Sequence, residues 1–212
     1  MKLPVIVIGA GGHARILIDA LVLTGREVIG IVDADVGRHG DKVLGIPVIG
    51  DDAAVFAHSP ANVELVNGLG SIQSTESREK VYNKFKQAGY SFSVVIHPAA
   101  TVAPDVRVGE GVQVMAGVVI QTGSRIGSNA IINTRASVDH DCAIGNHTHV
   151  APGAVLSGGV QVGDDVHIGT GAIIIQGIKI GKGSLIAAGA VIVQDVLAGE
   201  KIMGVPGKAV KR

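Results

Sequence analysis

The sequence of 212 residues predicts a small α/β domain followed by a parallel β-helix built from hexapeptides. The main observation is that every sixth residue from Ile96 to Ile192 is Ile, Val or Leu, without exception. A second is that glycine follows one of these aliphatic anchors at intervals of eighteen, at Gly109, Gly127, Gly145, Gly163 and Gly181. The third is that all five aromatic residues precede the repeat, as a core too narrow for rings requires.

The repeat defines the geometry of the expected rod. A period of six fits neither an α-helix nor a single amphipathic strand. Because the glycines recur every eighteen residues, three hexads make one coil with three short strands. The residue two positions before an anchor is small or β-branched, which suits a narrow triangular interior. Examples are Ala100, Ser124, Ala130, Ala136, Cys142, Ala154, Ala172 and Ala190.

The first forty residues follow a strand, glycine turn and helix pattern. An apolar run from Leu3 to Ile8 leads into a turn of sequence GAGGHA at residues 9–14, and a helical period follows. A second apolar run, Val28 to Val32, ends at Asp33, where a Rossmann-type fold places the acid that meets a ribose. Such a turn favours an anionic ligand, so we expect nucleotide binding. A dinucleotide cofactor and a purely structural turn are the alternatives.

Further short elements continue the domain. We expect strands at Ile46–Ile49 and Val63–Val66, with a helix from Asp51 to Ala57 between them. A second glycine turn, Asn67 to Ser71, follows at the same edge of the sheet if the strands are parallel. A helix capped by Ser74 or Thr75 then runs to Ala88. Its predicted solvated face carries Glu76, Arg78, Glu79, Lys80, Lys84 and Lys86, with Arg78 as an alternative phosphate contact.

Composition excludes several classes of function. The chain has 18 Lys plus Arg and 18 Asp plus Glu, so no overall field favours nucleic acid or an anionic membrane. The single cysteine, Cys142, excludes an intramolecular disulfide framework and lies in a core position. No signal peptide or membrane span is apparent, so we expect a cytoplasmic protein. The predicted division is a nucleotide-binding domain at 1–92, a β-helix at 93–196 and a tail at 197–212. The tail carries Lys201, Lys208, Lys211 and Arg212 without an acid.

Polar residues that depart from the hexad pattern collect between Asn133 and His167. The densest group is Asp139-His140-Asp141-Cys142, in which His140 lies two positions after an anchor, at a corner where side chains point outward. Gly158 lies eighteen residues beyond His140, hence one coil further and about 4.8 Å away. A glycine beside a base leaves space for a thioester, and its N–H can face an oxyanion. This pairing suits acyl transfer, with a surface histidine as the alternative.

The whole pattern resembles the sialic-acid O-acetyltransferase-like family of hexapeptide acyltransferases, which includes N-acetyltransferases of nucleotide-linked 4-amino-4,6-dideoxy sugars. The resemblance rests on the GxGGHA turn, the uninterrupted hexads, the His-Asp pair before Cys142 and the closing GVPGK motif at 204–208. It implies a left-handed β-helix, a homotrimer, and acetyl-CoA as co-substrate without a metal. It also implies transfer to the 4-amino group of a UDP- or GDP-linked sugar, with His140 as general base and Asp141 raising its basicity. Because Cys142 points inward and no serine lies beside His140, we expect direct transfer without an acyl-enzyme, with the Gly158 N–H at the oxyanion.

The resemblance further assigns binding residues. Those matching acetyl-CoA contacts are His149, Gly158, Thr170, Ala188 and Lys208. Those matching the nucleotide-sugar site are Gly11, Gly12, His13, Asp33 and Gly70, with His13 a phosphate or base contact. O-acetylation of a sialic-acid-like sugar is the alternative within this family. A carbonic anhydrase of the γ type is a rival for the same rod, since His149 and His167 are eighteen apart, and a nucleotide-sensing scaffold is the non-enzymatic alternative.

Overall fold

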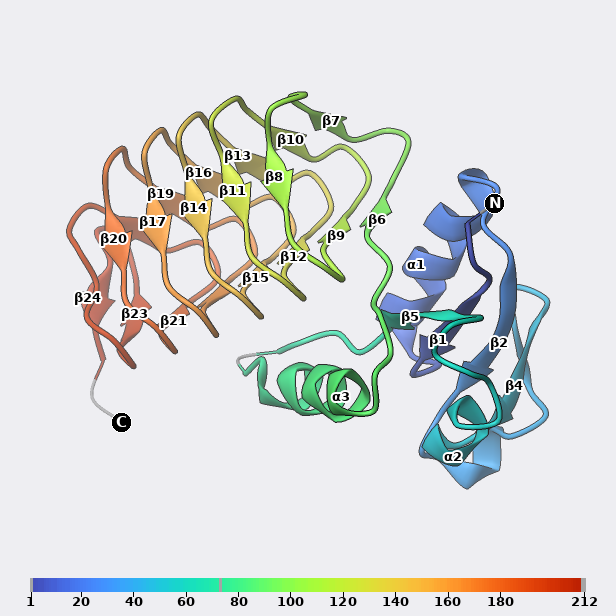
Figure 1. Ribbon diagram of the computed structural model, residues 1–212. Coiled ribbons are helices and arrows are strands. Elements are labelled where there is room, and N and C mark those ends of the chain that lie inside the picture. The colour runs from blue at the N-terminus through green and yellow to red at the C-terminus, as the bar shows by residue number, and fades with distance from the viewer. Residues whose placement is uncertain (1, 73, 211–212) are drawn as a thin grey trace.

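The computed structural model describes residues 2–72 and 74–210. A five-stranded sheet with its helices lies at one end of a long rod of stacked coils (Figure 1). The rod extends away from this sheet, and the C-terminal residues lie at its far end. The predicted class, a Rossmann-like domain followed by a parallel β-helix, is confirmed. A bridge between Leu65 and Phe92 ties the last aromatic residue to the N-terminal sheet, and the division after residue 92 stays a prediction.

The N-terminal sheet has the strand order β3-β4-β2-β1-β5. Its strands are parallel, apart from β3, which pairs antiparallel with β4. In chain order the elements are β1 (Val5–Ile8), α1 (Gly12–Leu23), β2 (Val28–Val32), a 3₁₀ turn (Val36–Arg38), β3 (Lys42–Val43), β4 (Ile46–Gly50), α2 (Asp52–Val55), β5 (Glu64–Asn67) and α3 (Glu76–Gln87). The predicted strands and helices are all present, while the 3₁₀ turn and β3 were not predicted.

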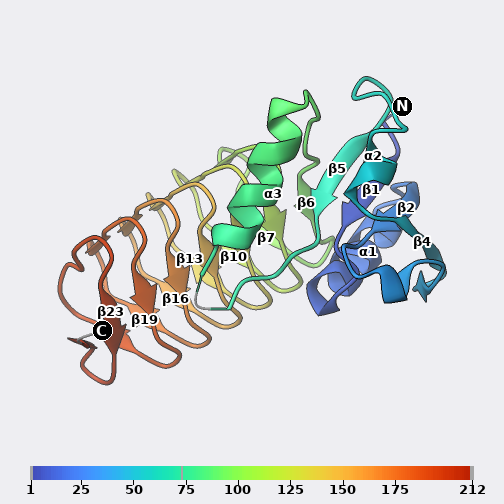
Figure 2. The same ribbon diagram turned by 90° about the horizontal axis from the view of Figure 1, so that it is seen from below.

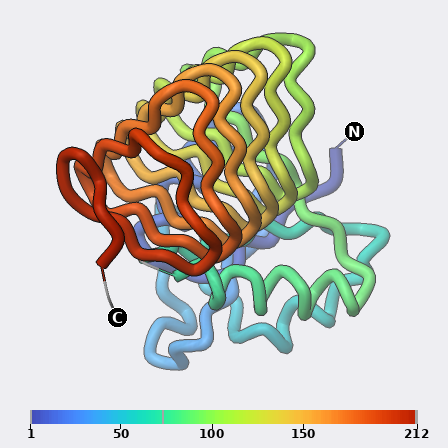
Figure 3. The backbone as a smooth tube through the Cα atoms, turned by 90° about the vertical axis from the view of Figure 1, so that its left-hand side faces the viewer, coloured from blue at the N-terminus to red at the C-terminus, as the bar shows by residue number. Residues whose placement is uncertain are grey.

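The rod consists of seventeen two-residue strands, β6 to β22, in which the second residue is always the aliphatic anchor. They are β6 (Val95–Ile96), β7 (Thr101–Val102), β8 (Arg107–Val108), β9 (Gln113–Val114), β10 (Val119–Ile120), β11 (Arg125–Ile126), β12 (Ile131–Ile132), β13 (Ser137–Val138), β14 (Ala143–Ile144), β15 (His149–Val150), β16 (Val155–Leu156), β17 (Gln161–Val162), β18 (His167–Ile168), β19 (Ile173–Ile174), β20 (Lys179–Ile180), β21 (Leu185–Ile186) and β22 (Val191–Ile192). Every third strand pairs in parallel, which gives three sheets. Figure 3 shows the coils stacked on one another.

We name the three sheets by one member each. The β12 sheet contains β6, β9, β12, β15, β18 and β21, the β13 sheet contains β7, β10, β13, β16, β19 and β22, and the β14 sheet contains β8, β11, β14, β17 and β20. The chain passes through them in this order, so each coil has one corner between the β12 and β13 sheets and another between the β13 and β14 sheets. These two corners carry the functional side chains described below.

The core of the rod is aliphatic, as the hexads predict. All anchors from Val114 to Ile192 are buried, whereas Ile96, Val102 and Val108 in the first coil are partly exposed, because no further coil covers them. The glycines spaced by eighteen allow neighbouring coils to approach closely. A Cβ added at Gly127 would lie 2.6 Å from the backbone nitrogen of Asn146, and one at Gly163 would lie 2.7 Å from that of Lys182. Glycine is therefore required there by coil-to-coil contact.

Helix α3 lies along the rod and connects it to the N-terminal sheet (Figure 2). Tyr82 of α3 packs against Phe92 and His147, with ring centroids 4.7 and 5.4 Å apart respectively. Arg78 is 1% exposed and donates hydrogen bonds to the backbone oxygens of Asn67, Leu69 and Asn129. The prediction of a solvated Arg78 is therefore wrong, because its side of α3 faces the rod. Burial lowers the pKa of Arg78 to about 9.

The end of the chain closes the rod. Strand β23 (Lys201–Met203) pairs in parallel with β21, and β24 (Lys208–Ala209) pairs antiparallel with β23. Part of the predicted tail thus extends the β12 sheet, while Lys211 and Arg212 lie outside the described residues. Among residues 2–72 and 74–210, no helix combines the length and apolar character needed to cross a membrane.

Candidate active site

His140 lies at the corner between β13 and β14, and its side chain is 48% exposed. Its Nδ1 is 2.9 Å from Oδ2 of Asp141. Asp139 holds the backbone of the same corner, since its Oδ1 accepts a hydrogen bond from the His140 N–H at 2.8 Å. The hydrogen bond to Asp141 raises the pKa of His140, with a further contribution from the charge of Asp139. The ring therefore has a fixed orientation and an increased basicity.

Gly158 lies directly beside this ring, one coil further along the rod. A Cβ added to Gly158 would lie 2.5 Å from Nε2 of His140, so any side chain there would collide with the imidazole. The backbone N–H of Gly158 has no hydrogen-bond partner among the described residues. The structure thus brings together His140, Asp141 and Gly158, as the eighteen-residue spacing predicted. A basic nitrogen and an N–H donor without a partner among the described residues therefore belong to neighbouring residues.

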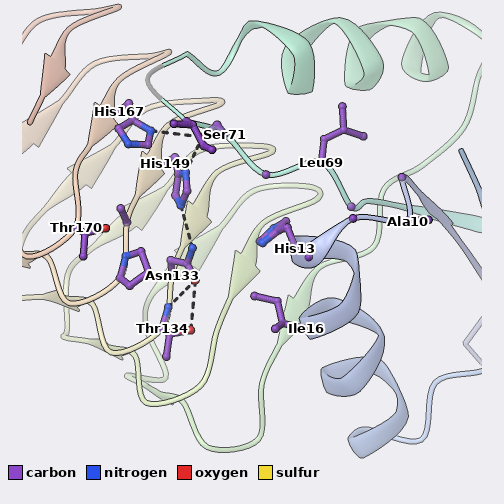
Figure 4. A pocket seen from close by; sticks show the side chains of 18 of the residues that line it. Ala10, His13, Ile16, Leu69, Ser71, Asn133, Thr134, His149, His167 and Thr170 are labelled. Carbon is purple, nitrogen blue, oxygen red and sulfur yellow. Dashed lines mark hydrogen bonds between the residues drawn. The ribbon is translucent and has the colours of Figure 1, made fainter. Parts of the chain in front are cut away.

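A cavity of about 810 Å³ lies between the start of α1 and the corner that joins the β12 and β13 sheets. Figure 4 shows His13 and Ile16 of α1 on one side and Asn133, His149 and Thr170 of the rod on the other. All five predicted nucleotide-sugar residues line it: Gly11, Gly12, His13, Asp33 and Gly70. Two predicted acetyl-CoA contacts, His149 and Thr170, line it as well.

The remaining predicted residues lie elsewhere in the single chain. His140, Asp141 and Gly158 occupy the corner after the β13 sheet, whereas the cavity occupies the corner before it. Ala188 stacks one coil beyond Thr170, because Ile168 pairs with Ile186. Lys208 is exposed in β24 at the end of the rod. One chain therefore presents the predicted base and the predicted nucleotide site at the two edges of the same sheet.

Comparison with known proteins gives the family. Residues 4–85 match the PglD N-terminal domain, and residues 123–158 and 159–194 match the bacterial transferase hexapeptide repeat. GDP-perosamine N-acetyltransferase of Escherichia coli O157:H7 is 31% identical over 156 residues, which are 72% of this chain and 69% of that protein. The chain belongs to this family of hexapeptide-repeat sugar N-acetyltransferases.

Solved structures that resemble this chain are also acetyltransferases of nucleotide-linked sugars or acetyltransferase domains. PerB from Caulobacter crescentus, in complex with CoA and GDP-perosamine, is 42% identical with a TM-score of 0.91, over 100% of this chain and 99% of its own. Two further structures of the Caulobacter enzyme carry a substituted histidine. The acetyltransferase domain of PglB from Neisseria gonorrhoeae, in complex with acetyl coenzyme A, is 36% identical with a TM-score of 0.90, over 99% of this chain and 100% of that chain.

Within this N-acetyltransferase fold, Cys142 is not placed for covalent chemistry. Its side chain is buried, as predicted, and its Sγ donates a hydrogen bond to the backbone oxygen of Ser157 at 3.3 Å. Burial raises the pKa of the Cys142 thiol, which disfavours the nucleophilic thiolate. The arrangement around His140 therefore favours a base over a base–nucleophile pair.

The walls of the N-acetyltransferase cavity carry little charge. Among the lining residues that the structure describes, Asp33 is the one with a formal charge. Its carboxylate accepts hydrogen bonds from the backbone N–H groups of Ala10 at 2.6 Å and Asp35 at 2.9 Å, so Asp33 shapes the first glycine turn. The space around Gly11 and Gly12 is open. Since the first N–H groups of a helix have no partner within it, the start of α1 can bind an anion.

The histidines of the cavity are neutral at physiological pH. Burial, assisted by the charge of Arg78, lowers the pKa of His13 to about 4. Burial and the neighbouring His167, His13 and Arg78 lower the pKa of His149 to about 3. The rings of His149 and His167 are 5.0 Å apart, yet within the described part of the chain no group of three or more His, Cys, Asp or Glu could hold a metal ion. The third ligand that a carbonic anhydrase site needs is absent from those residues.

Several residues that line the cavity were not predicted from the sequence. Ser71, Ile72, Asn133, Thr134 and Pro152 also line the cavity. Asn133 begins the polar cluster and Ser71 is the last residue of the second glycine turn, so the sequence pointed to both positions. Gln113 was missed although it is the polar first residue of a strand whose neighbours in the same sheet are often apolar. It is 1% exposed and contacts His13.

Proposed function

We propose that this protein transfers the acetyl group of acetyl-CoA to the 4-amino group of a GDP-linked 4-amino-4,6-dideoxy sugar. The observation that carries this proposal is the His140–Asp141 pair against Gly158, on a chain whose other corner bears a cavity with two glycine turns. The GDP nucleotide is favoured over UDP by the relatives, since PerB binds CoA and GDP-perosamine and the Escherichia coli relative is a GDP-perosamine N-acetyltransferase.

The chemistry follows from the geometry of the His140 corner. The amine nitrogen attacks the thioester carbonyl while Nε2 of His140 takes one amine proton. The N–H of Gly158 stabilises the oxyanion of the tetrahedral intermediate. The C–S bond then breaks, and the proton from His140 passes to the departing thiolate of CoA. Asp141 accepts from Nδ1–H throughout, which leaves the Nε2 lone pair for the substrate and stabilises the imidazolium.

Acetyl-CoA is proposed to lie along the rod. Thr170 and Ala188 stack in successive coils at one corner, which supports their assignment to a groove lined by backbone groups. Lys208, exposed at the end of the rod, is a suitable cation for the phosphates of the coenzyme. His149 lies deeper, and its contacts inside the cavity suit the acetyl end better than the nucleotide end of the coenzyme.

The proposed assembly is a homotrimer in which one active site uses two chains. The β13 sheet lies between the His140 corner and the cavity corner, and its outer face carries Val155 and Ile173, which are 39% and 43% exposed. The β14 sheet instead presents Arg107, Arg125 and Lys179 as the outward residues of its strands. An uncharged apolar face supports contact between copies. That contact would bring the His140 corner of one copy to the cavity of the next. The substrates also support a cytoplasmic location.

A thiol-release assay tests the proposed function. Acetyl-CoA is supplied with GDP-linked and UDP-linked 4-amino-4,6-dideoxy sugars, and with free and CMP-linked sialic acid in parallel. We expect turnover on the GDP-linked amino sugar, with a product acetylated on nitrogen by mass spectrometry. Turnover on the UDP-linked sugar alone would correct the nucleotide. Turnover confined to sialic acids would replace the proposal by O-acetylation.

A further inference from the structure

Three neutral histidines line the cavity, and side-chain amides hold two of them. Gln113 of β9 contacts His13, and Asn133, after β12, contacts His149. Gln113 is 1% exposed and Asn133 is 9% exposed, so both amides are buried where their hydrogen bonds must be satisfied. An amide has one accepting and one donating end. Its second hydrogen bond therefore fixes which end faces the histidine, and hence which ring nitrogen carries the proton.

The hydrogen bonds of Gln113 determine the tautomer of His13. Nε2 of Gln113 donates to the backbone oxygen of Asn67 at 2.7 Å, since two oxygens could not face each other at this distance. Oε1 of Gln113 must then face Nε2 of His13, 2.7 Å away. The Nε2 of His13 is consequently the protonated nitrogen. Its Nδ1 has no partner in the described chain, and His13 lines the cavity, so Nδ1 offers a lone pair as an acceptor.

The hydrogen bonds of Asn133 determine the opposite tautomer for His149. The backbone N–H of Thr134 donates to Oδ1 of Asn133 at 2.8 Å, so the amide Nδ2 faces Nε2 of His149 at 3.1 Å. Nε2 of His149 is then the acceptor and Nδ1 carries the proton. This proton is donated to Oγ of Ser71 at 2.6 Å.

The hydroxyl proton of Ser71 consequently points away from His149. Nδ1 of His167 is the one alternative acceptor that the described residues offer it, at 3.5 Å. That distance is at the limit of a hydrogen bond. Ser71 lines the cavity and is partly exposed, so its O–H is available to a ligand. The chain of bonds from Thr134 to Ser71 crosses from the rod to the N-terminal part.

We propose that Gln113 and Asn133 are positioning residues that lock His13 and His149 in opposite tautomers, so that the cavity recognises its ligand through an acceptor at His13 Nδ1 and a donor at Ser71 Oγ. The assignment of this ligand as a nucleotide sugar rests on the proposed function. The tautomers themselves rest on the hydrogen bonds of the protein alone.

This pattern selects the part of the ligand that each residue meets. Phosphate oxygens only accept hydrogen bonds at neutral pH, so His13 Nδ1 does not bind a phosphate. It takes an N–H or O–H group, such as a base N–H or a hydroxyl of the ribose or sugar. Of the two expectations for His13, the base contact is retained and the phosphate contact is dropped. The N–H groups at the start of α1 would then bind the diphosphate of the ligand.

The pattern is also insensitive to pH across the physiological range. The ionisable groups near His13 and His149 are Arg78 of α3, His167 of β18, the two histidines themselves and Asp33 across the cavity. Burial and the Arg78 charge both oppose protonation of the rings. We therefore expect ligand recognition to remain unchanged across the physiological pH range.

The first test is the histidine ¹⁵N spectrum of the wild-type protein without ligand. We expect His13 with a protonated Nε2 and an unprotonated Nδ1, and His149 with the reverse, both constant between about pH 5.5 and 8. A His13 ring protonated on Nδ1, or a titration of either ring inside this range, would overturn the proposal. This result does not depend on any enzymatic activity.

The second test converts the acceptor of His13 into a donor. Gln113→Glu keeps one oxygen against Nε2 of His13 and adds a negative charge, which raises the pKa of His13. It also removes the hydrogen bond to the backbone oxygen of Asn67, so the unfolding midpoint is measured alongside to confirm that the variant is folded. We expect the affinity for GDP and for the GDP-linked amino sugar, measured by calorimetry, to fall about tenfold as His13 Nδ1 becomes protonated. In Gln113→Glu this fall should appear as the pH is lowered. In wild type and in Gln87→Glu, the same change at the exposed end of α3, the affinity should not change with pH. Affinity that does not follow Nδ1 protonation would contradict the proposal.

The third test addresses the donor and needs no change in the buried amides. Ser71→Ala should lower the affinity for the same two ligands about tenfold and leave the His149 tautomer unchanged, whereas Ser71→Thr should restore it. Equal affinity in Ser71→Ala would remove Ser71 from the proposal. If wild type binds neither ligand, the proposed function fails and the ligand assignment with it, whereas the tautomer result stands separately.

Discussion

At the scale of single residues, the reactive corner depends on contacts between neighbouring coils. His140 and Gly158 are eighteen residues apart, and the stacking of coils places a Cβ at residue 158 within 2.5 Å of Nε2 of His140. The period alone predicted this proximity, and the adjacent Asp141 predicted the orientation of the ring. The sequence did not predict the tautomers in the cavity, because they depend on Gln113, which is distant in the sequence from His13.

Replacing Asp141 with asparagine separates basicity from proximity. The base acts in its neutral form, and the hydrogen bond to Asp141 raises the pKa of His140 above its usual 6.5. The acid limb of kcat/KM in the wild type therefore lies above pH 6.5, and activity is lost as the pH falls through it. In Asp141→Asn we expect this limb to move to lower pH while the plateau falls ~10² to 10⁴-fold. A limb that stays in place would show that Asp141 does not act on His140.

Gly158→Ala tests the close approach to the base. The backbone of Gly158 is not in the left-handed region, so alanine there causes no backbone strain, and the added methyl group acts on the His140 ring alone. We expect kcat to fall about 10²-fold because the imidazole is displaced. The unfolding midpoint should change little, since the ring can move toward solvent. Full activity in Gly158→Ala would contradict the assigned contact.

At the scale of elements, the hexads fixed the strands of the rod almost residue by residue, while the face of α3 was misjudged. Because Arg78 is charged, we expected it on the solvated face of the helix. The spacing indicates the buried face instead, because Arg78, Tyr82 and Phe85 follow the i, i+4, i+7 pattern of one side of a helix. The 3₁₀ turn and β3 were missed because each is only two or three residues long and has no periodicity to detect.

Arg78→Leu should weaken the junction between α3, the second glycine turn and the rod. The guanidinium satisfies the backbone oxygens of Asn67, Leu69 and Asn129, which remain buried after the substitution. We expect the free energy of unfolding in urea to fall by about 2 to 4 kcal/mol. Lys80→Leu, on the exposed side of the same helix, is the control and should change it by less than about 0.5 kcal/mol. Equal effects of the two substitutions would refute the role of Arg78.

At the scale of the whole molecule, one chain has the base and the cavity on opposite edges of the β13 sheet. The sequence predicted both sets of residues but not their separation, since the hexad period does not distinguish one corner of the coil from another. The N-terminal part covers the cavity corner and leaves the His140 corner exposed. The proposed trimer follows from this separation together with the apolar outer face of the β13 sheet.

Ile173→Glu tests the β13 face as the contact between copies. A charge at residue 173, on the second strand from the end of this face, is costly when buried against another copy and harmless in water. We expect sedimentation to show a folded monomer, with acetyl transfer lost. Lys179→Glu, on the outer face of the β14 sheet, is the matched control and should leave both the mass and the activity unchanged. A trimer that persists in Ile173→Glu would move the interface elsewhere.

Mixed assemblies test most directly the claim that catalysis joins His140 of one chain to the cavity of another. Chains with His140→Ala lack the base, and chains with Asp33→Ala have a damaged cavity, so each alone should be inactive in the thiol-release assay. After equal mixing through unfolding and reassembly, about a quarter of the sites in a cyclic trimer combine an intact base with an intact cavity. We expect activity to return to about this fraction of the wild-type value. A mixture that stays inactive, although it contains mixed trimers by mass spectrometry, would contradict the shared site.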